Sequence, residues 1–272
     1  MERARWFAFR PDRSAWHAFV VTAGGIVVVS GLLRAVPPHW QGSVVAITYS
    51  IWLALALAYG YRVSSLAAVG LTSRRLLPGT VAAIAVALLG VAGSLQDPTM
   101  VGAALVLPDP PLLLAMLVTT LAAAFAEQLV FAGYLQLRME AAFGRLAGIL
   151  AYATLFTGFH VALIWLPGAV PPSGGGMTQF VGGLFAASCL VALIFTYARN
   201  VWAMALAGCV NAMLLNLYRL SVRPDEVLVA DPSVLRSGLP LLLGWFFAVW
   251  LTGRMIRGAV PGWLNVPLRR RT

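Results

Sequence analysis

Residues 114–139 read LAMLVTTLAAAFAEQLVFAGYLQLRM, and this stretch decides the fold. It holds about twenty apolar residues before Arg138, which is the length that a helix needs to cross a bilayer. It also holds one carboxylate in its interior, Glu127. An ionised side chain near the middle of a membrane helix costs roughly 3 kcal/mol or more, so Glu127 needs a functional or structural reason to be there.

The composition of the whole chain agrees with a membrane protein. Of its 272 residues, 60% are hydrophobic and only 10% are charged, whereas a soluble domain carries about 25% charged residues. The formal net charge is +10 and all 19 basic residues are arginines. Most of them lie at the termini and in short connections, as the positive-inside rule requires, so the charge is not an indication of nucleic-acid binding.

The apolar segments predict a single all-α transmembrane domain over residues 1–272, with eight helices. Residues 1–16 form a basic lead-in and residues 259–272 a basic tail. Arginines also occur in the second, fourth and sixth connections, which requires an even number of spans and both termini in the cytoplasm. The predicted spans are residues 17–37, 43–59, 80–95, 114–139, 146–166, 178–198, 200–218 and 239–254.

Residues 97–111 are predicted to form an external loop between the third and fourth spans. They hold two acids, four prolines and no basic residue. An acidic connection without arginine belongs on the outside, and the residue before each proline is biased away from helix.

Three polar residues in the spans are candidates for a site: Glu127, His160 and Asn211. Counted from the Arg-bearing ends of their helices, Glu127 and Asn211 lie roughly 16 Å and His160 roughly 21 Å deep. Three different helices therefore bring a carboxylate, an imidazole and an amide to similar depth. Each residue also has a structural interpretation, because buried acids, histidines and asparagines can bridge membrane helices by hydrogen bonds.

The three groups together favour hydrolysis. A carboxylate in a poorly solvated pocket can act as general base for a water molecule. An imidazole can share that water, and an amide N–H can donate to the oxyanion of a tetrahedral intermediate. Ser188, Cys189 and Cys209 are weaker candidates for a nucleophile, because no elbow or orienting acid accompanies them.

The motifs resemble those of a known family. Residues 126–135, AEQLVFAGYL, resemble the first motif of the CAAX protease and bacteriocin-processing family, also called the ABI family, which usually reads two glutamates, three residues and an arginine. Residues 156–160, FTGFH, match its second motif, and Asn211 fits the asparagine of its third, His-x3-Asn. The resemblance covers a motif-bearing core of about residues 66–217, and eight spans is the usual count in the family.

The resemblance implies that Glu127 and His160 activate water and that Asn211 belongs to the oxyanion site. Phe131 and Phe156 keep the motif phenylalanines. Three positions depart from the pattern. The second glutamate is Gln128, the arginine is Ala132 and the histidine of the third motif is Ala207. A missing oxyanion donor typically costs on the order of a hundredfold in rate.

Two functions are therefore open. The first is an intramembrane endopeptidase that cleaves a peptide or a lipid-modified protein near the cytoplasmic side. The second is a catalytically impaired pseudoenzyme that binds or assembles another membrane protein or a peptide. We expect an integral protein of the plasma (inner) membrane of a bacterium.

No cofactor and no metal are expected. Zinc catalysis needs three protein ligands, and the sequence has no H-E-x-x-H pair. A transporter is disfavoured because no inverted repeat is visible and only one acid lies deep in a span.

Overall fold

The computed structural model describes residues 6–9, 13–37, 44–45, 47–54, 56, 66–96, 100–163 and 176–222. Every regular element in these ranges is a helix. Residues 44–45, 47–54 and 56 are helical as well. The other elements are α1 (Arg13–Ala35), the 3-10 turn η1 (Leu66–Val69), α3 (Leu76–Ser94), α4 (Pro110–Gln128), the π-helix η3 (Leu129–Gln136), α5 (Leu137–Phe143), α6 (Arg145–Leu163), α7 (Gly176–Ala198) and α8 (Val201–Val222).

The all-helical membrane fold is confirmed. Six helices among the described residues are long and apolar enough to cross a bilayer. They correspond to the predicted first, third, fourth, fifth, sixth and seventh spans. The predicted second span, 43–59, is helical wherever it is described, and the eighth, 239–254, lies outside the described residues. The count of eight and the orientation of the termini stay predictions.

The predicted fourth span is longer in the structure. α4, η3 and α5 join into one helix, Pro110–Phe143, of 34 residues. At about 1.5 Å per residue it is roughly 50 Å long and exceeds the roughly 30 Å hydrocarbon core. Pro110 and Pro111 belong to the first turn of this helix and not to the predicted loop 97–111, because proline fits the first helical turn. Glu127 therefore lies near the middle of the long helix.

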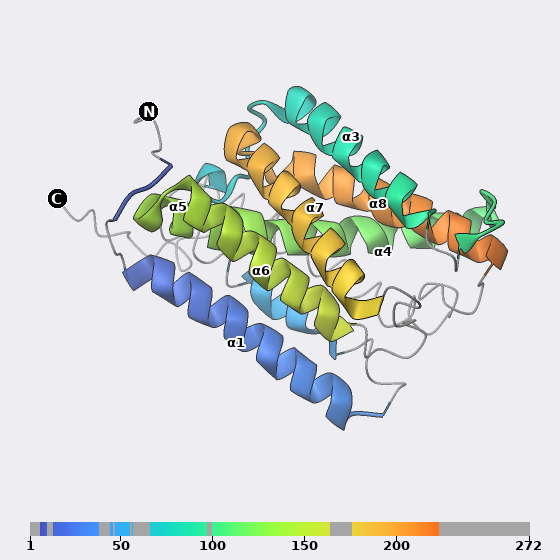
Figure 1. The fold of residues 1–272 in the computed structure, drawn as a ribbon, viewed down its shortest axis with the longest axis horizontal. Helices are drawn as coiled ribbons and strands as arrows, with labels where there is room; N and C mark the ends of the chain where they lie inside the picture. Colours follow the sequence, from blue (N-terminus) through green and yellow to red (C-terminus); the bar gives the residue numbers. More distant parts are fainter. Residues whose placement is uncertain are drawn as a thin grey trace, which may run out of the picture.

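The helices pack as one bundle around η3. Figure 1 shows α1, α6 and α7 side by side. α3 packs against α7 and α8, and α4 packs against α8. All eight residues of η3 are buried. The outer faces of the bundle expose large apolar side chains such as Val27 on α1 and Val81 on α3. An apolar exterior is the arrangement that contact with lipid favours.

The N-terminal residues dock where α5 ends and α6 begins. Ala8 N donates to Phe143 O at 3.2 Å, and Leu146 N donates to Trp6 O at 3.3 Å. Gly144 separates the two helices with φ +93°, and a Cβ at this position would lie 2.8 Å from Ala8 N. Glycine is thus needed here both for its backbone conformation and for the close approach of the lead-in.

The loop of residues 70–75 fixes the start of α8. Val201 N donates to Gly70 O at 2.9 Å. The fully buried Asn200 side chain donates to Thr72 O at 2.6 Å and to Arg74 O at 2.9 Å, and it accepts from Ala203 N at 3.0 Å. Asn200 therefore caps α8 and ties it to the beginning of α3.

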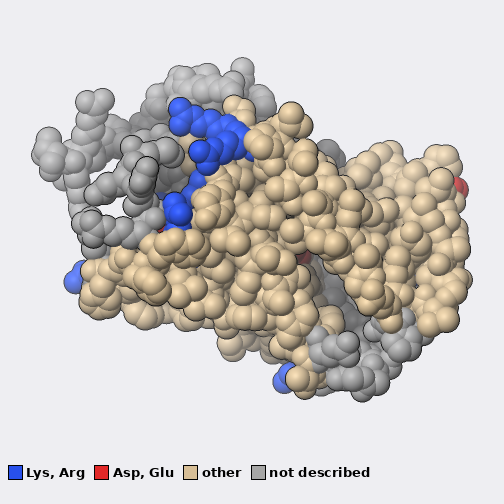
Figure 2. All heavy atoms as spheres, turned by 45° about the horizontal axis from the view of Figure 1, so that its top comes forward, with Lys and Arg blue, Asp and Glu red and all other residues tan. Residues whose placement is uncertain are grey.

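Arginines mark one end of the bundle. On the face drawn in Figure 2, most arginine atoms cluster toward one end, and a carboxylate-bearing residue lies at the opposite end. Arg75 donates to Tyr197 O, and the Arg145 guanidinium lies 5.5 Å from the centre of the Tyr197 ring. Arg199 follows in the turn between α7 and α8. The beginnings of α3 and α6 and the end of α7 thus meet at one arginine-rich end.

Candidate active site

The first motif runs directly into the π-helix. Glu127 and Gln128 end α4, and η3 begins at Leu129. A π-helix is rare and is often found at functional sites. A Cβ at Gly133 would collide with the carbonyl oxygen of Val69 and lie 3.1 Å from Val201 Cγ2. Because position 133 is a glycine, η3 can pack closely against the backbone of Val69 and the side chain of Val201.

The carboxylate of Glu127 is only partly buried and has a tyrosine as its partner. The Tyr49 hydroxyl, on the helical stretch 47–54, donates a hydrogen bond to Glu127 Oε1. In the part of the chain that the structure describes, no arginine or histidine forms an ion pair with Glu127. Among the described residues, the carboxylate is therefore held by a neutral donor and not by a cation.

His160 is oriented by its own helix. Its Nδ1 lies 3.0 Å from Phe156 O, and its ring centre lies 4.3 Å from that of Phe156. A carbonyl oxygen can only accept, so the geometry assigns the proton of a neutral imidazole to Nδ1. The Nε2 lone pair is then left to accept a proton or a hydrogen bond.

The packing register brings Glu127 and His160 to one level. α6 runs antiparallel to the long helix, since Gly148 lies beside Gln136 while Phe156 packs on Phe131 with ring centres 5.3 Å apart. From that pair, one turn back along the long helix reaches Glu127, and one turn forward along α6 reaches His160.

Aromatic rings connect the two sides of this level. The Tyr49 ring centre lies 5.6 Å from that of Phe159, the neighbour of His160. No hydrogen bond among the described residues joins Glu127 and His160 directly.

The motif positions that differ from the family pattern form a neutral set. Tyr152, on α6, donates to Gln128 Oε1 at 3.1 Å, and both side chains are buried. Gln128 replaces a glutamate, and the fully buried Ala132 replaces an arginine. The two changes remove one negative and one positive charge, so the local net charge is the same as with both present. Burying either charge without the other would be costly.

Asn211 lies apart from the pair. A Cβ at Gly90 on α3 would be 3.3 Å from Asn211 Oδ1, so this side chain points toward α3. α8 is antiparallel to α4, with Thr120 Oγ1 3.5 Å from Cys209 Sγ and the Phe125 and Trp202 rings stacked at 4.5 Å.

This register sets Asn211 about two turns, or roughly 12 Å, from the level of Glu127. The buried Ala207, the other altered position on α8, lies one turn closer. The predicted oxyanion role of Asn211 rests on its motif alone. The depth count from the sequence differed because the long helix continues to Phe143, beyond the assumed end at Arg138.

The described residues offer few groups for a metal site or for a cysteine nucleophile. Among the described residues, no group of three His, Cys, Asp or Glu side chains is placed to hold a metal ion. Glu127 and His160 offer two donors where a zinc site needs three, so no catalytic step is assigned to a metal. Cys189 and Cys209 are free thiols. Cys209 contacts Thr120, which is a packing contact between α4 and α8.

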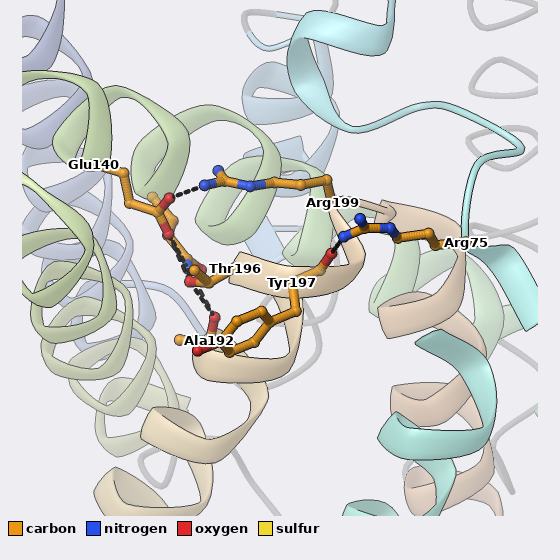
Figure 3. Close-up of polar contacts among 7 residues, drawn as sticks. Arg75, Glu140, Ala192, Thr196, Tyr197 and Arg199 are labelled. Atoms are coloured by element: carbon orange, nitrogen blue, oxygen red, sulfur yellow. Dashed lines mark hydrogen bonds and ion pairs between the residues drawn. The ribbon is translucent and has the colours of Figure 1, made fainter. Parts of the chain in front are cut away.

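A second polar cluster was missed by sequence reasoning. Figure 3 shows Glu140 of α5 facing Thr196 and Arg199 at the end of α7. Arg199 forms an ion pair with Glu140, and Thr196 Oγ1 donates to Glu140 Oε1 at 2.7 Å. Gln136 Nε2 donates to Glu140 at 2.8 Å and to Ala192 O at 2.8 Å.

The sequence carried a partial signal for this cluster. Gln136 and Glu140 are four residues apart and therefore share a helix face. The predicted fourth span ends at residue 139, directly before Glu140, and only the packing of α7 shows that Glu140 is buried. Tyr49 was missed for a similar reason, because one hydroxyl in an apolar span does not reveal its partner.

The family comparison agrees with this arrangement of motifs. Residues 109–214 match the family model described as type II CAAX prenyl endopeptidase Rce1-like. The Rce1-like segment covers α4 to the greater part of α8 and contains Glu127, His160 and Asn211. The resemblance read from the motifs is thereby confirmed for this segment, and it supports a membrane protease. Comparisons with curated proteins and with solved structures gave no match.

Proposed function

We propose that the protein is an intramembrane endopeptidase in which Glu127 and His160 activate a water molecule. The observation that carries the proposal is their common level on facing helices of the Rce1-like segment, with His160 Nδ1 already engaged. The chain has no cation on Glu127 among the described residues, which leaves the carboxylate able to take a proton.

The reaction uses these two side chains in sequence. Glu127 accepts a proton as the water oxygen attacks the peptide carbonyl carbon. His160 Nε2 orients the water by accepting its second hydrogen. The tetrahedral oxyanion then collapses, the C–N bond breaks, and the proton held by Glu127 passes to the leaving nitrogen. The products are a carboxylic acid and an amine, and the carboxylate of Glu127 is restored.

The proposed substrate is a peptide or a lipid-modified protein that enters from the bilayer. The arginine-rich end of the bundle is assigned to the cytoplasm by the positive-inside rule. Glu127 and His160 then lie within the membrane. From the predicted even number of spans we infer that both termini, including the basic tail 259–272, face the cytoplasm at a bacterial plasma (inner) membrane.

The altered motif residues favour one alternative function, a pseudoenzyme that binds another membrane protein or a peptide. Gln128, Ala132 and Ala207 replace three polar motif residues, and Asn211 lies about two turns from the pair. A protein with these features would bind a membrane protein or peptide at this site and have no hydrolytic activity.

A cleavage assay distinguishes the two functions. The protein in nanodiscs is incubated with a library of membrane-embedded and prenylated peptides, and products are read by mass spectrometry. We expect cleavage that falls by at least about a hundredfold in Glu127→Gln, since a general base contributes that much or more. The double variant Glu140→Gln/Arg199→Gln is the control on the same helix: it removes both charges of the other ion pair and should retain most of the activity.

No cleavage by the wild-type protein, together with a membrane partner that co-purifies, would support the pseudoenzyme. Stoichiometric zinc at Glu127 and His160 would overturn the metal-free mechanism.

A further inference from the structure

Tyr49 lies outside the segment that the family model matches, yet it touches the central carboxylate. The Rce1-like segment spans residues 109–214, and the tyrosine reaches Glu127 from the helical stretch 47–54. The Tyr49 side chain is 6% exposed. A polar hydroxyl buried in a membrane helix needs a partner, and here that partner is the proposed general base.

The ring of Tyr49 is held on several sides. Its centre lies 5.6 Å from the Phe159 ring and 6.5 Å from the Trp52 ring. Trp52 packs in turn on Phe131 of η3, with ring centres 5.6 Å apart, and lies directly over Gly25 of α1. The Tyr49 ring is thus held by Phe159 of α6 and by Trp52, which itself packs against α1 and η3. A donor fixed in this way can hold a carboxylate in one rotamer.

The altered first motif explains why a contact between Tyr49 and Glu127 matters. The family pattern has an arginine where this chain has Ala132, and an arginine orients neighbouring carboxylates. With Ala132 fully buried and no ion pair to Glu127 among the described residues, another group must fix the carboxylate. Tyr49 donates to Oε1, which leaves Oε2 as the oxygen that can face a water molecule.

We propose that Tyr49 is the positioning residue of this site and orients the Glu127 carboxylate in place of the motif arginine. This inference rests on the proposed hydrolysis. A neutral donor fixes the carboxylate without compensating its charge, so the base stays able to accept a proton. Tyr49 acts through Glu127 and makes no bond to the substrate.

Tyr49→Phe tests the proposal because it keeps the packed ring and removes the hydroxyl. We expect kcat to fall about 10- to 100-fold, as for a misplaced catalytic group, with KM unchanged within about twofold. The matched control is Tyr134→Phe. It removes another buried hydroxyl, which lies 3.0 Å from His17 Nδ1 of α1, and should leave kcat unchanged within about twofold.

A second measurement does not depend on cleavage. Dicyclohexylcarbodiimide modifies protonated carboxyl groups in membranes, and mass spectrometry gives the rate at Glu127 relative to Glu140 in the same sample. Loss of the Tyr49 donor should raise the relative rate at Glu127 by roughly fivefold, because a hydrogen bond to a charged group is lost. Tyr134→Phe should leave the relative rate unchanged.

The outcomes separate the two proposals. Unchanged kcat and unchanged labelling in Tyr49→Phe would overturn the positioning role, as would a loss that appears in KM alone. Faster labelling of Glu127 in a protein whose wild type cleaves nothing would overturn the hydrolysis, and the positioning role with it, while the contact itself would stand.

Discussion

The two carboxylates of the long helix, Glu140 and Glu127, are stabilised in different ways. Glu140 is 5% exposed, pairs with Arg199 and accepts hydrogen bonds from Gln136 and Thr196. Glu127, thirteen positions earlier, accepts from the Tyr49 hydroxyl and has no cation beside it among the described residues.

The comparison shows how one helix separates structure from chemistry. The buried carboxylate of Glu140, with a cation and two hydrogen-bond donors beside it, ties α5 to α7. A carboxylate with one neutral donor is held in place but can still exchange a proton with water. The charge partner, more than the depth in the membrane, distinguishes the two glutamates.

The largest expected effect is on stability at Glu140. Glu140→Ala leaves the partly exposed Arg199 cation without its partner and removes the buried acceptor of Gln136 and Thr196, which together cost up to about 3 kcal/mol. Unfolding of the detergent-solubilised protein would measure this cost. Arg199→Ala should be comparably harmful. The double variant should cost clearly less than the sum of the two, because it removes both charges. Additive losses would show that the two side chains do not interact.

A smaller effect is expected where Glu140 meets α6. A Cβ at Gly148 would collide with Glu140 Cγ and lie 3.0 Å from Gln136 O. Gly148→Ala should therefore destabilise the protein by about 1–3 kcal/mol, as overpacking does. Gly158→Ala is the control on the same helix, where a Cβ meets nothing within 4 Å. Equal free energies of unfolding for the two variants would contradict the close packing of Glu140 against Gly148.

The smallest effect on stability is expected at Glu127. Glu127→Gln keeps an oxygen that can accept from Tyr49, and no cation loses its partner. The free energy of unfolding should therefore change by less than about 1 kcal/mol, although cleavage is lost. A cost as large as that of Glu140→Ala, measured in the same detergent, would make Glu127 a structural acid and would remove the distinction between the two glutamates.

Much of the fold could be predicted from the chain because the bilayer limits the choices. A run of about twenty apolar residues in lipid must satisfy its own backbone, so it becomes a helix. The described helices follow the predicted spans closely, and α7 ends at the predicted Ala198. The extension of the fourth span to Phe143 was not predicted, because polar residues at Arg138 and Glu140 resemble the end of a membrane helix.

The candidate site was predictable only in part. Glu127 and His160 stand out as an acid and a histidine in apolar runs, and antiparallel packing indeed brings them to one level. Asn211 stands out in the same way, but counting residues from helix ends cannot give the register between α4 and α8. That register depends on contacts such as Thr120 with Cys209.

The sequence by itself determined the membrane class, the helices and the motif residues, because these follow from hydrophobicity and local spacing. Only the tertiary structure decided that Tyr49 meets Glu127, that Tyr152 meets Gln128 and that Glu140 meets Arg199. In each case the partners come from different helices. Their meeting depends on the rotation and register of packed helices, which are fixed by close contacts at small residues such as Gly133 and Gly148.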